Sequence, residues 1–273
     1  PYIAAAKELK TKPTQHSVKQ LQEVGIQPDI LVLRTEYELS LALRKKVALF
    51  CNVDPAAVIQ SIDVPSIYEV PLKMHQQHLD EIVLTKTGLP INGEPHLEPW
   101  LNFLHRMKNA TKTVRIGLVG KYVELPDAYK SINESLFQAA TYNDRKLDLQ
   151  YIHSEKLNSG NVDAMLSSLD GVLIAPGFGQ RGIEGKFIAL KYAREHDIPT
   201  FGVCLGMQCM VIEYARDVLG YTDANSTEMD VTTKHNVIDL MEEQKSITNM
   251  GGTMRLGAYD CILAEDSIAA KAY

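Results

Sequence analysis

Short apolar runs alternate with longer amphipathic segments along the second half of the chain. Four runs have the character of buried strands: Val114–Val119, Leu147–Ile152, Gly171–Ala175 and Pro199–Val203. Segments with helical spacing lie between or after them: Ala128–Tyr142, Ile183–His196 and Met207–Leu219. Strands that alternate with helices predict an α/β domain, in which helices cover both faces of a mostly parallel sheet.

The first hundred residues also mix helical and strand patterns. The pattern predicts a helix over Pro13–Val24, a strand over Ile30–Leu33, a second helix over Leu41–Phe50 and a mostly helical stretch over Ile67–Val83. These strands are too few to close a sheet. We therefore expect this region to be the C-terminal part of another α/β domain, whose first strands precede Pro1.

A segment rich in proline and glycine separates the two regions. It contains four residues that interrupt regular structure: Pro90, Gly93, Pro95 and Pro99. The predicted organisation is a first domain over residues 1–88, a linker over 89–112 and a second domain over 113–273 that is truncated at its C-terminus. The apolar side chains of the linker are expected to pack a short helix onto a domain: Trp100, Leu101, Phe103 and Leu104.

Composition limits the class of protein. The 273 residues are 45% hydrophobic and 23% charged, which is typical of soluble globular proteins. Lys and Arg total 28 against 34 Asp and Glu, so the basic surface needed for general nucleic-acid binding is missing. No apolar run approaches the ~20 residues that cross a bilayer, and no signal-sequence pattern is present. We predict a cytoplasmic protein with no membrane or nucleic-acid partner.

The four cysteines are spaced unlike a metal site. They are Cys51, Cys204, Cys209 and Cys261, and no two form a C-x-x-C pair. Four cysteines in a chain of this length are also too few for a disulfide scaffold. We expect reduced thiols, most of them in the core, and no metal site.

One cysteine lies in a pattern that predicts chemistry. Gly202-Val203-Cys204-Leu205-Gly206 reads G-x-C-x-G where a strand runs into a helix, the pattern of a nucleophile elbow. The amides of the following helix would favour the Cys204 thiolate, and the Leu205 amide could face an oxyanion. The alternative is a buried core cysteine after a strand.

A second glycine loop follows the preceding strand and allows two interpretations. Gly177, Gly179 and Gly182 match G-x-G-x-x-G, the dinucleotide-binding pattern, and Glu195 or Asp197 lies near the distance of a ribose ligand. The Gly177 amide could equally be the second oxyanion donor opposite Cys204. The thiol elbow one strand later favours acyl transfer, and a nicotinamide-dinucleotide oxidoreductase using Gly177–Gly182 stays the alternative.

A lysine-rich segment near the start could bind an anion. Residues 7–16 contain three lysines and two threonines ahead of a helix with Pro13 in its first turn. Lysines beside helix-terminal amides suit a nucleoside triphosphate. A solvated basic stretch is the alternative interpretation.

Longer strings in both halves resemble the CTP synthase family. They are Lys10–Lys19, Gly25–Ile30, Ala48–Val53 and Ser66–Pro71 in the first half, and Gly120–Tyr122, Leu125–Ser131, the Cys204 elbow, Ala224–Glu228 and Gly251–Gly257 in the second. The resemblance runs from Pro1 to about Leu263. It implies the end of a P-loop-type synthetase domain followed by a class I glutaminase domain with a flavodoxin-like fold.

The resemblance also implies an activity and its ligands. The family aminates UTP to CTP: ATP phosphorylates the uracil 4-oxygen, and ammonia from glutamine hydrolysis displaces that phosphate. The implied ligands are glutamine, UTP, ATP with Mg²⁺, CTP as inhibitor and GTP as activator. The family forms a homotetramer in which the UTP site lies between subunits.

Site residues carried over from the family fall into three groups. For the glutaminase, the resemblance implies Cys204 as nucleophile, Gly177 and Leu205 at the oxyanion, and glutamine contacts at Gly177, Leu205, Gly206, Met207, Gln208, Glu228 and Arg255. For UTP and CTP it implies Lys10, Thr11, Lys12, Pro13, Thr14, Gln15 and Lys46. For the adenine of ATP it implies Ile62, Asp63 and Val64. An arginine and a glutamate suit the two charges of free glutamine.

Two departures from the family qualify these expectations. The phosphate loop and the magnesium carboxylates are expected before Pro1, and the His and Glu of the catalytic triad after Tyr273; none of the eight histidines replaces them by motif. Pro176 stands where many relatives have a second glycine, which removes one backbone donor. We therefore expect a fragment that is inactive alone, and a non-catalytic regulatory module stays a third interpretation.

Overall fold

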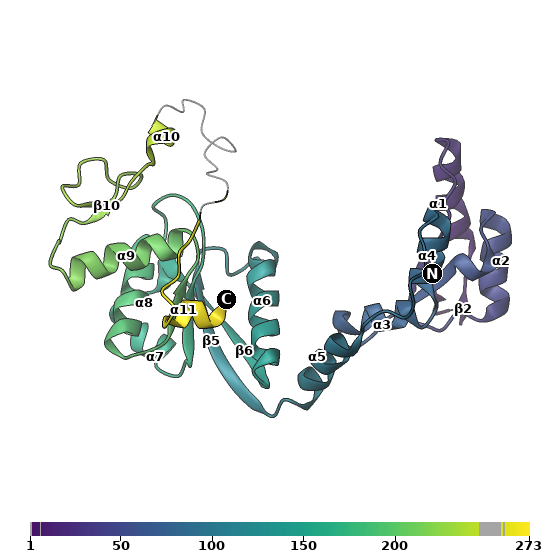
Figure 1. Cartoon of the computed structure of the whole chain (residues 1–273), viewed down its shortest axis with the longest axis horizontal. Coiled ribbons are helices and arrows are strands. Elements are labelled where there is room, and N and C mark those ends of the chain that lie inside the picture. Colours follow the sequence, from purple (N-terminus) through teal and green to yellow (C-terminus); the bar gives the residue numbers. More distant parts are fainter. Residues whose placement is uncertain (1, 6, 246–257, 259) are drawn as a thin grey trace. The chain divides into compact units, whose positions relative to one another are not determined.

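The computed structural model describes residues 2–5, 7–245, 258 and 260–273 (Figure 1). The chain divides into two compact units, Pro1–Lys108 and Asn109–Tyr273. The boundary falls inside the segment predicted to be a linker. The whole string Gly251–Gly257, Arg255 included, lies outside the described residues.

The first unit is built on a short parallel pair of strands. Its elements are β1 (Tyr2–Ile3), β2 (Glu8–Leu9), α1 (Lys12–Glu23), β3 (Leu31–Thr35), α2 (Leu41–Cys51), η1 (Pro55–Ala57), β4 (Val58–Ile62), η2 (Ile67–Glu69), α3 (Val70–His75), α4 (Leu79–Thr87) and α5 (Glu98–Asn109). Strands β3 and β4 pair in parallel from Leu31 opposite Val58 to Thr35 opposite Ile62. Their buried side chains pack against α1 and α2, with Val18, Val47 and Cys51 at the centre.

Most of the elements predicted for the first unit are confirmed, and the structure adds the short strands β1, β2 and β4 and the turn η1. The predicted helices and strand agree with α1, β3 and α2 to within one or two residues. Strand β4 was not predicted, because polar Gln60 and Ser61 interrupt its apolar run. Helix α5 occupies half of the proline-rich segment; its Leu104 is buried, and the Trp100 indole donates to the Tyr68 carbonyl at 2.9 Å. The expected packing of a short helix is confirmed for Trp100, Phe103 and Leu104, whereas Leu101 is 49% exposed.

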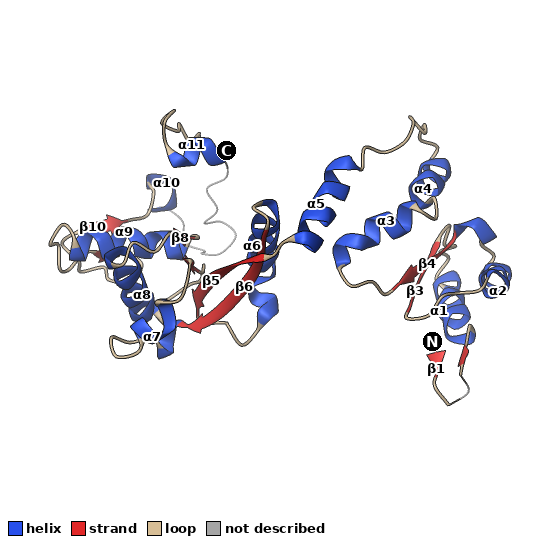
Figure 2. Cartoon of the chain, turned by 90° about the horizontal axis from the view of Figure 1, so that it is seen from below, coloured by secondary structure: helices blue, strands red, loops and turns tan. Residues whose placement is uncertain are grey.

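The second unit is a four-stranded parallel sheet with helices on both faces (Figure 2). The strands lie in the order β6 (Arg145–His153), β5 (Lys112–Gly120), β7 (Gly171–Ile174) and β8 (Thr200–Gly202). The main helical elements are η3 (Pro126–Tyr129), α6 (Lys130–Tyr142), η4 (Ser154–Lys156), α7 (Val162–Leu166), α8 (Ile183–Glu195) and α9 (Leu205–Asp217). All four predicted strands and all three predicted helices are confirmed.

Alternation along the strands sends side chains to two separate cores. Leu118 and Leu173 pack on the face covered by α6, whereas their neighbours Val119 and Ile174 pack on the face covered by α7, α8 and α9. Both faces of the central strands are therefore buried, which explains the apolar run of β7 and of the second half of β5, whereas β6 at the edge alternates polar and apolar residues. The mostly parallel α/β fold predicted for this half is confirmed.

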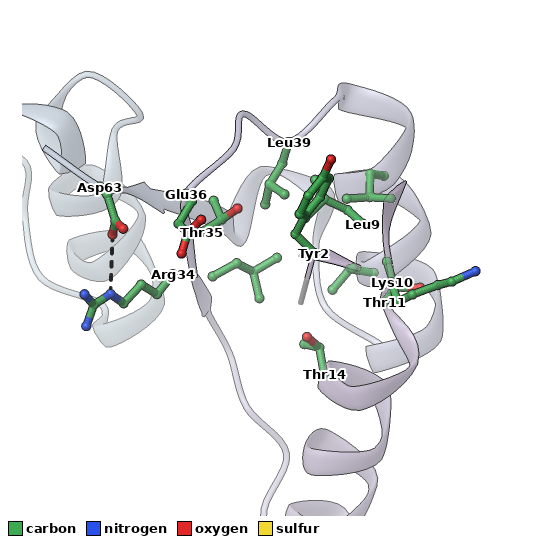
Figure 3. A pocket seen from close by; sticks show the side chains of 13 residues that line it. Tyr2, Leu9, Lys10, Thr11, Thr14, Arg34, Thr35, Glu36, Leu39 and Asp63 are labelled. Atoms are coloured by element: carbon green, nitrogen blue, oxygen red, sulfur yellow. Dashed lines mark hydrogen bonds and ion pairs between the residues drawn. The ribbon is translucent and has the colours of Figure 1, made fainter. Parts of the chain in front are cut away.

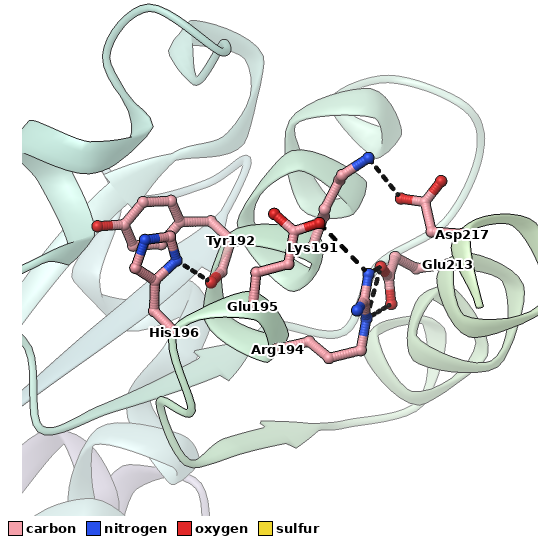
Figure 4. Close-up of polar contacts among 7 residues, drawn as sticks. All are labelled: Lys191, Tyr192, Arg194, Glu195, His196, Glu213 and Asp217. Carbon is pink, nitrogen blue, oxygen red and sulfur yellow. Dashed lines mark hydrogen bonds and ion pairs between the residues drawn. The ribbon is translucent and has the colours of Figure 1, made fainter.

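Helices α8 and α9 are joined by an ion pair with a buried carboxylate (Figure 4). The Arg194 guanidinium donates to Glu213 from Nη2 at 2.7 Å and from Nε at 3.1 Å, and the Glu213 side chain is only 5% exposed. Lys191 and Asp217 form a second, more exposed pair at 3.3 Å. These contacts join the C-terminal halves of α8 and α9, away from the elbow at the start of α9.

Smaller elements follow the sheet. They are a parallel pair, β9 (Asn225–Ser226) and β10 (Asn236–Ile238), and two short helices, α10 (Glu242–Lys245) and α11 (Ile268–Ala272). Within the described ranges, no helix combines the length and apolarity that a bilayer crossing requires.

Candidate active site

Cys204 occupies a strained turn between β8 and α9. Its backbone has φ 54° and ψ −114°, a positive φ that non-glycine residues rarely adopt. Helix α9 begins at Leu205, two residues earlier than predicted, so the cysteine directly precedes the first helical turn. Its side chain is exposed. Strain of this kind is concentrated at functional sites, and it matches the turn expected from G-x-C-x-G.

The two flanking glycines are required by backbone contacts. A Cβ placed on Gly202 would lie 2.5 Å from the Met207 amide nitrogen. A Cβ placed on Gly206 would overlap the carbonyl oxygen of Ile174, at the end of β7. Any larger residue at either position would push the elbow away from the sheet, so the predicted sharp turn is present and depends on both glycines.

The loop after β7 lies beside the elbow. Because β7 and β8 are adjacent and parallel, both loops leave the same edge of the sheet. A Cβ built on Gly177 would lie 3.7 Å from Cδ2 of Leu205. Among the described residues, no hydrogen bond uses the amide of Gly177 or of Leu205 as donor. The two predicted oxyanion donors are thus neighbours with free amides.

Other loops support the one that carries Gly177. The Lys121 ammonium, after β5, donates to the Phe178 carbonyl. The Gln180 amide donates to the Met229 carbonyl at 2.6 Å, which joins this loop to the loop after β9. Arg181 pairs with Glu155 at 3.3 Å. Lys121 and Gln180 were not predicted, since no local motif shows that loops distant in sequence meet at one sheet edge.

The residues predicted to bind glutamine differ in where they lie. Gly206, Met207 and Gln208 form the first turn of α9 beside the cysteine. Glu228 is exposed in the loop that Gln180 joins to the Gly177 loop. The structure therefore brings six of the seven predicted contacts to one edge of the sheet, Gly177 and Leu205 included, and Arg255 is outside the described residues.

The four cysteines differ in their surroundings, and only Cys51 and Cys209 lie in the core, where most of the four were expected. Burial raises the pKa of the Cys209 thiol to about 11 and also raises the pKa of the Cys51 thiol. Both thiols are therefore protonated at neutral pH and shielded from reagents. Cys204 and Cys261 are exposed, and of these two only Cys204 stands at a helix N-terminus.

A cavity of about 530 Å³ lies in the first unit (Figure 3). Its polar lining comes from the segment before and within α1, from the end of β3 and from the residue after β4: Lys10, Thr11, Thr14, Arg34, Thr35, Glu36 and Asp63. Four of these were predicted at nucleotide sites: Lys10, Thr11, Thr14 and Asp63. The other predicted nucleotide residues lie outside the lining: Lys12, Pro13, Gln15, Lys46, Ile62 and Val64.

Arg34 is a lining residue that the sequence did not indicate. Its Nε lies 3.5 Å from Oδ1 of Asp63, across the parallel pair of strands. The pairing of Thr35 with Ile62 brings the two side chains together. Nothing in the local sequence indicates Arg34, because its partner is 29 residues away and directly follows a strand that the pattern did not predict.

Comparison with known families agrees with this geometry. Residues 124–271, more than half of the chain, match the family described as glutamine amidotransferase class-I. The chain belongs to the class-I glutamine amidotransferase family. The loop Gly177–Gly182 lies inside the matched region, so nothing supports the alternative of a dinucleotide-binding oxidoreductase.

Residues 1–89 match a second family, described as CTP synthase N-terminus. Over all 273 residues the chain is 68% identical to the CTP synthase of Bacteroides fragilis and 66% identical to that of Porphyromonas gingivalis. In each case it covers 51% of the relative, so this amidotransferase chain spans about half the length of the curated relatives it matches. The expected resemblance to the CTP synthase family is confirmed.

One solved structure is also similar. The glutaminase domain of Trypanosoma brucei CTPS with bound acivicin shares 41% sequence identity and a TM-score of 0.45, over 48% of this chain and 51% of that one.

Proposed function

We propose that the protein containing this chain is a glutamine-hydrolysing CTP synthase, which aminates UTP to CTP with ATP and with ammonia from glutamine. The observation that carries the proposal is the strained, exposed Cys204 between two obligatory glycines, in a chain so similar to named CTP synthases. A cysteine elbow beside free amides suits attack on a carboxamide.

The proposed hydrolysis proceeds by acyl transfer to sulfur. The Cys204 thiolate adds to the carboxamide carbon of glutamine, and the carbonyl electron pair moves to oxygen, where the amides of Gly177 and Leu205 stabilise it. Collapse of this intermediate forms a thioester and breaks the C–N bond, and the departing nitrogen takes a proton to leave as ammonia. Water then releases glutamate. The resemblance implies a His–Glu pair as the general base and acid.

Recognition of glutamine needs both charges of the free amino acid. We propose that Glu228 meets the α-ammonium and Arg255 the α-carboxylate, with the first turn of α9 from Gly206 to Gln208 beside the side chain. The hydrogen bond from Gln180 to Met229 supports this assignment, because it keeps the Glu228 loop next to Gly177.

The cavity of the first unit is proposed as part of the nucleotide site. Lys10, Thr11 and Thr14 would contact UTP, or CTP as inhibitor, together with the remaining residues carried over from the family: Lys12, Pro13, Gln15 and Lys46. Asp63, flanked by Ile62 and Val64, would contact the adenine of ATP. The ion pair of Asp63 with Arg34 adds a planar cation to this group.

The remaining partners follow from the family. We propose activation by GTP, a homotetramer and a cytoplasmic location. ATP would bind with Mg²⁺, but the described residues bring together no group of three or more His, Cys, Asp or Glu side chains that could hold a metal ion.

The test is Cys204→Ala in the protein at the full length of its curated relatives. CTP formation from glutamine should fall by at least about 100-fold, whereas formation from added ammonia should stay within about twofold, because amination takes place in the other domain. Cys261→Ala, which removes the other exposed thiol, is the matched control. Equal loss of both rates would show that Cys204 is not the glutaminase nucleophile.

A further inference from the structure

A lysine is buried below the sheet edge that carries the elbow. Lys186, in α8, is 1% exposed, and its ammonium donates to the Ala175 carbonyl at 2.7 Å. Among the described residues no carboxylate pairs with it. Lysine is almost never fully buried without an anionic partner, because its charge loses hydration. Burying this ammonium costs its hydration, so packing alone does not explain a lysine at this position.

The carbonyl that Lys186 contacts lies between the two halves of the site. Ala175 is fully buried and its amide donates to the Val119 carbonyl at 2.9 Å, so both of its backbone polar groups are bonded. The preceding carbonyl, of Ile174, accepts from the Val203 amide and is the atom against which Gly206 packs. The next residues are Pro176 and Gly177. The ammonium thus anchors the loop at the point where it leaves the sheet.

Burial lowers the pKa of Lys186. The bond to the Ala175 carbonyl is the contact through which this side chain meets the loop.

We propose that Lys186 is a positioning residue for glutamine hydrolysis: its bond to the Ala175 carbonyl sets the start of the Pro176–Gly182 loop and so places the Gly177 amide at the oxyanion. The proposal rests on the function proposed above. A donor displaced from the oxyanion affects the transition state more than bound glutamine, so kcat and not KM should respond.

The experiment uses Lys186→Met in the protein at the full length of its curated relatives. Methionine is apolar, of similar length and without donors. We expect kcat for glutamine hydrolysis to fall about 10- to 100-fold, somewhat less than for outright loss of an oxyanion donor. KM should stay within about threefold, and ammonia-dependent CTP formation within about twofold. Lys191→Met, on an exposed turn of the same helix, is the matched control and should change neither constant.

A second measurement separates positioning from loss of structure. Iodoacetamide alkylates a thiolate by displacing iodide, without an oxyanion, so its rate at Cys204 should stay within about twofold in Lys186→Met. A purely structural role would instead expose buried Cys209 to the reagent and reduce all activities together. If Lys186→Met does not fold, Lys186→Leu, which also lacks a donor, is measured in its place, with the same expectation.

Three results have defined meanings. An unchanged kcat in a folded Lys186 variant would overturn the proposal. A fall in kcat accompanied by labelling of Cys209 would also overturn it. Failure of the function proposed above is distinct, because Cys204→Ala would then keep glutamine hydrolysis whatever the result at Lys186.

Discussion

The two candidate sites are built in different ways. The Cys204 site depends on backbone geometry: a positive φ, two glycines in contact with neighbouring backbone, and two free amides at the edge of a sheet buried on both faces. The cavity of the first unit depends on side chains, and its ion pair is open to solvent, with Arg34 87% and Asp63 48% exposed. Short two-stranded sheets border it, β1 with β2 and β3 with β4.

This difference predicts which changes each site tolerates. A site defined by packed backbone is precise but fails when a single methyl group is added, because a close-packed interior cannot yield. At a site formed by exposed side chains, a substitution leaves the fold intact. It removes only the contacts that the substituted group made. Four substitutions test the contrast.

The largest effect is expected for Gly206→Ala. The added Cβ overlaps the Ile174 carbonyl oxygen, so the elbow must move away from β7 and from Gly177. Glutamine hydrolysis should fall by about 100-fold or more, as for loss of an oxyanion donor, and stability by about 1–3 kcal/mol. Steady-state kinetics and denaturant unfolding measure both. Gly160→Ala, on an exposed turn, is the control; similar losses in the two variants would refute the argument from backbone contact.

Arg194→Met should destabilise the second unit without touching the site. It leaves the buried Glu213 carboxylate unpaired, which costs about 3–5 kcal/mol. The comparison is Arg115→Met, which removes a half-exposed pair with Asp148 at 3.8 Å and should cost less than about 1 kcal/mol. Denaturant unfolding compares the two. Equal costs would mean that burial does not set the strength of these pairs.

Asp63→Asn should separate binding from stability in the first unit. Loss of one charge from an exposed pair should change the free energy of unfolding by less than about 1 kcal/mol. The KM for ATP should rise about tenfold, since a hydrogen bond to a charged group contributes about 1.5–3 kcal/mol. Initial rates with varied ATP measure this, with Asp29→Asn as control. A fall in stability with unchanged KM would remove Asp63 from the nucleotide site.

The smallest effect concerns acid stability of the second unit. A hydrogen bond from His235, at 2.6 Å, and one from the Lys234 amide lower the pKa of Asp223. Because the folded-state pKa is below the unfolded-state value near 3.9, these bonds stabilise the fold above about pH 4 and are lost as pH falls through the folded-state pKa.

Asp223→Asn should therefore reduce the slope of stability against pH between about pH 2 and 4. Acid unfolding followed by circular dichroism detects this, and Glu265→Gln, at an exposed position, should leave the slope unchanged. An identical slope in Asp223→Asn would show that the bond to His235 does not contribute.

Strong local patterns were sufficient to predict most of the fold. The central strands of the second unit contain short apolar runs, and the helices between them carry apolar residues at helical spacing, so both kinds of element could be assigned. The elbow was predictable for a related reason. A sharp turn before a helix needs glycine on both sides of its nucleophile, and this requirement gives a recognisable pattern of five consecutive residues. Strand β4 and helix α5 have weaker patterns, since polar residues interrupt the strand and a proline lies at the start of the helix.

Three features could be predicted from the sequence because each depends on neighbouring residues: the alternation of strands and helices, the turn at Cys204 and the resemblance to a family. Three contacts became visible only in the folded structure: Lys186 buried against Ala175, Gln180 joining the Glu228 loop to the Gly177 loop, and Arg34 beside Asp63. These contacts join residues 11 to 49 positions apart. They depend on which strands lie side by side, and strand order is set by the packing of the whole sheet.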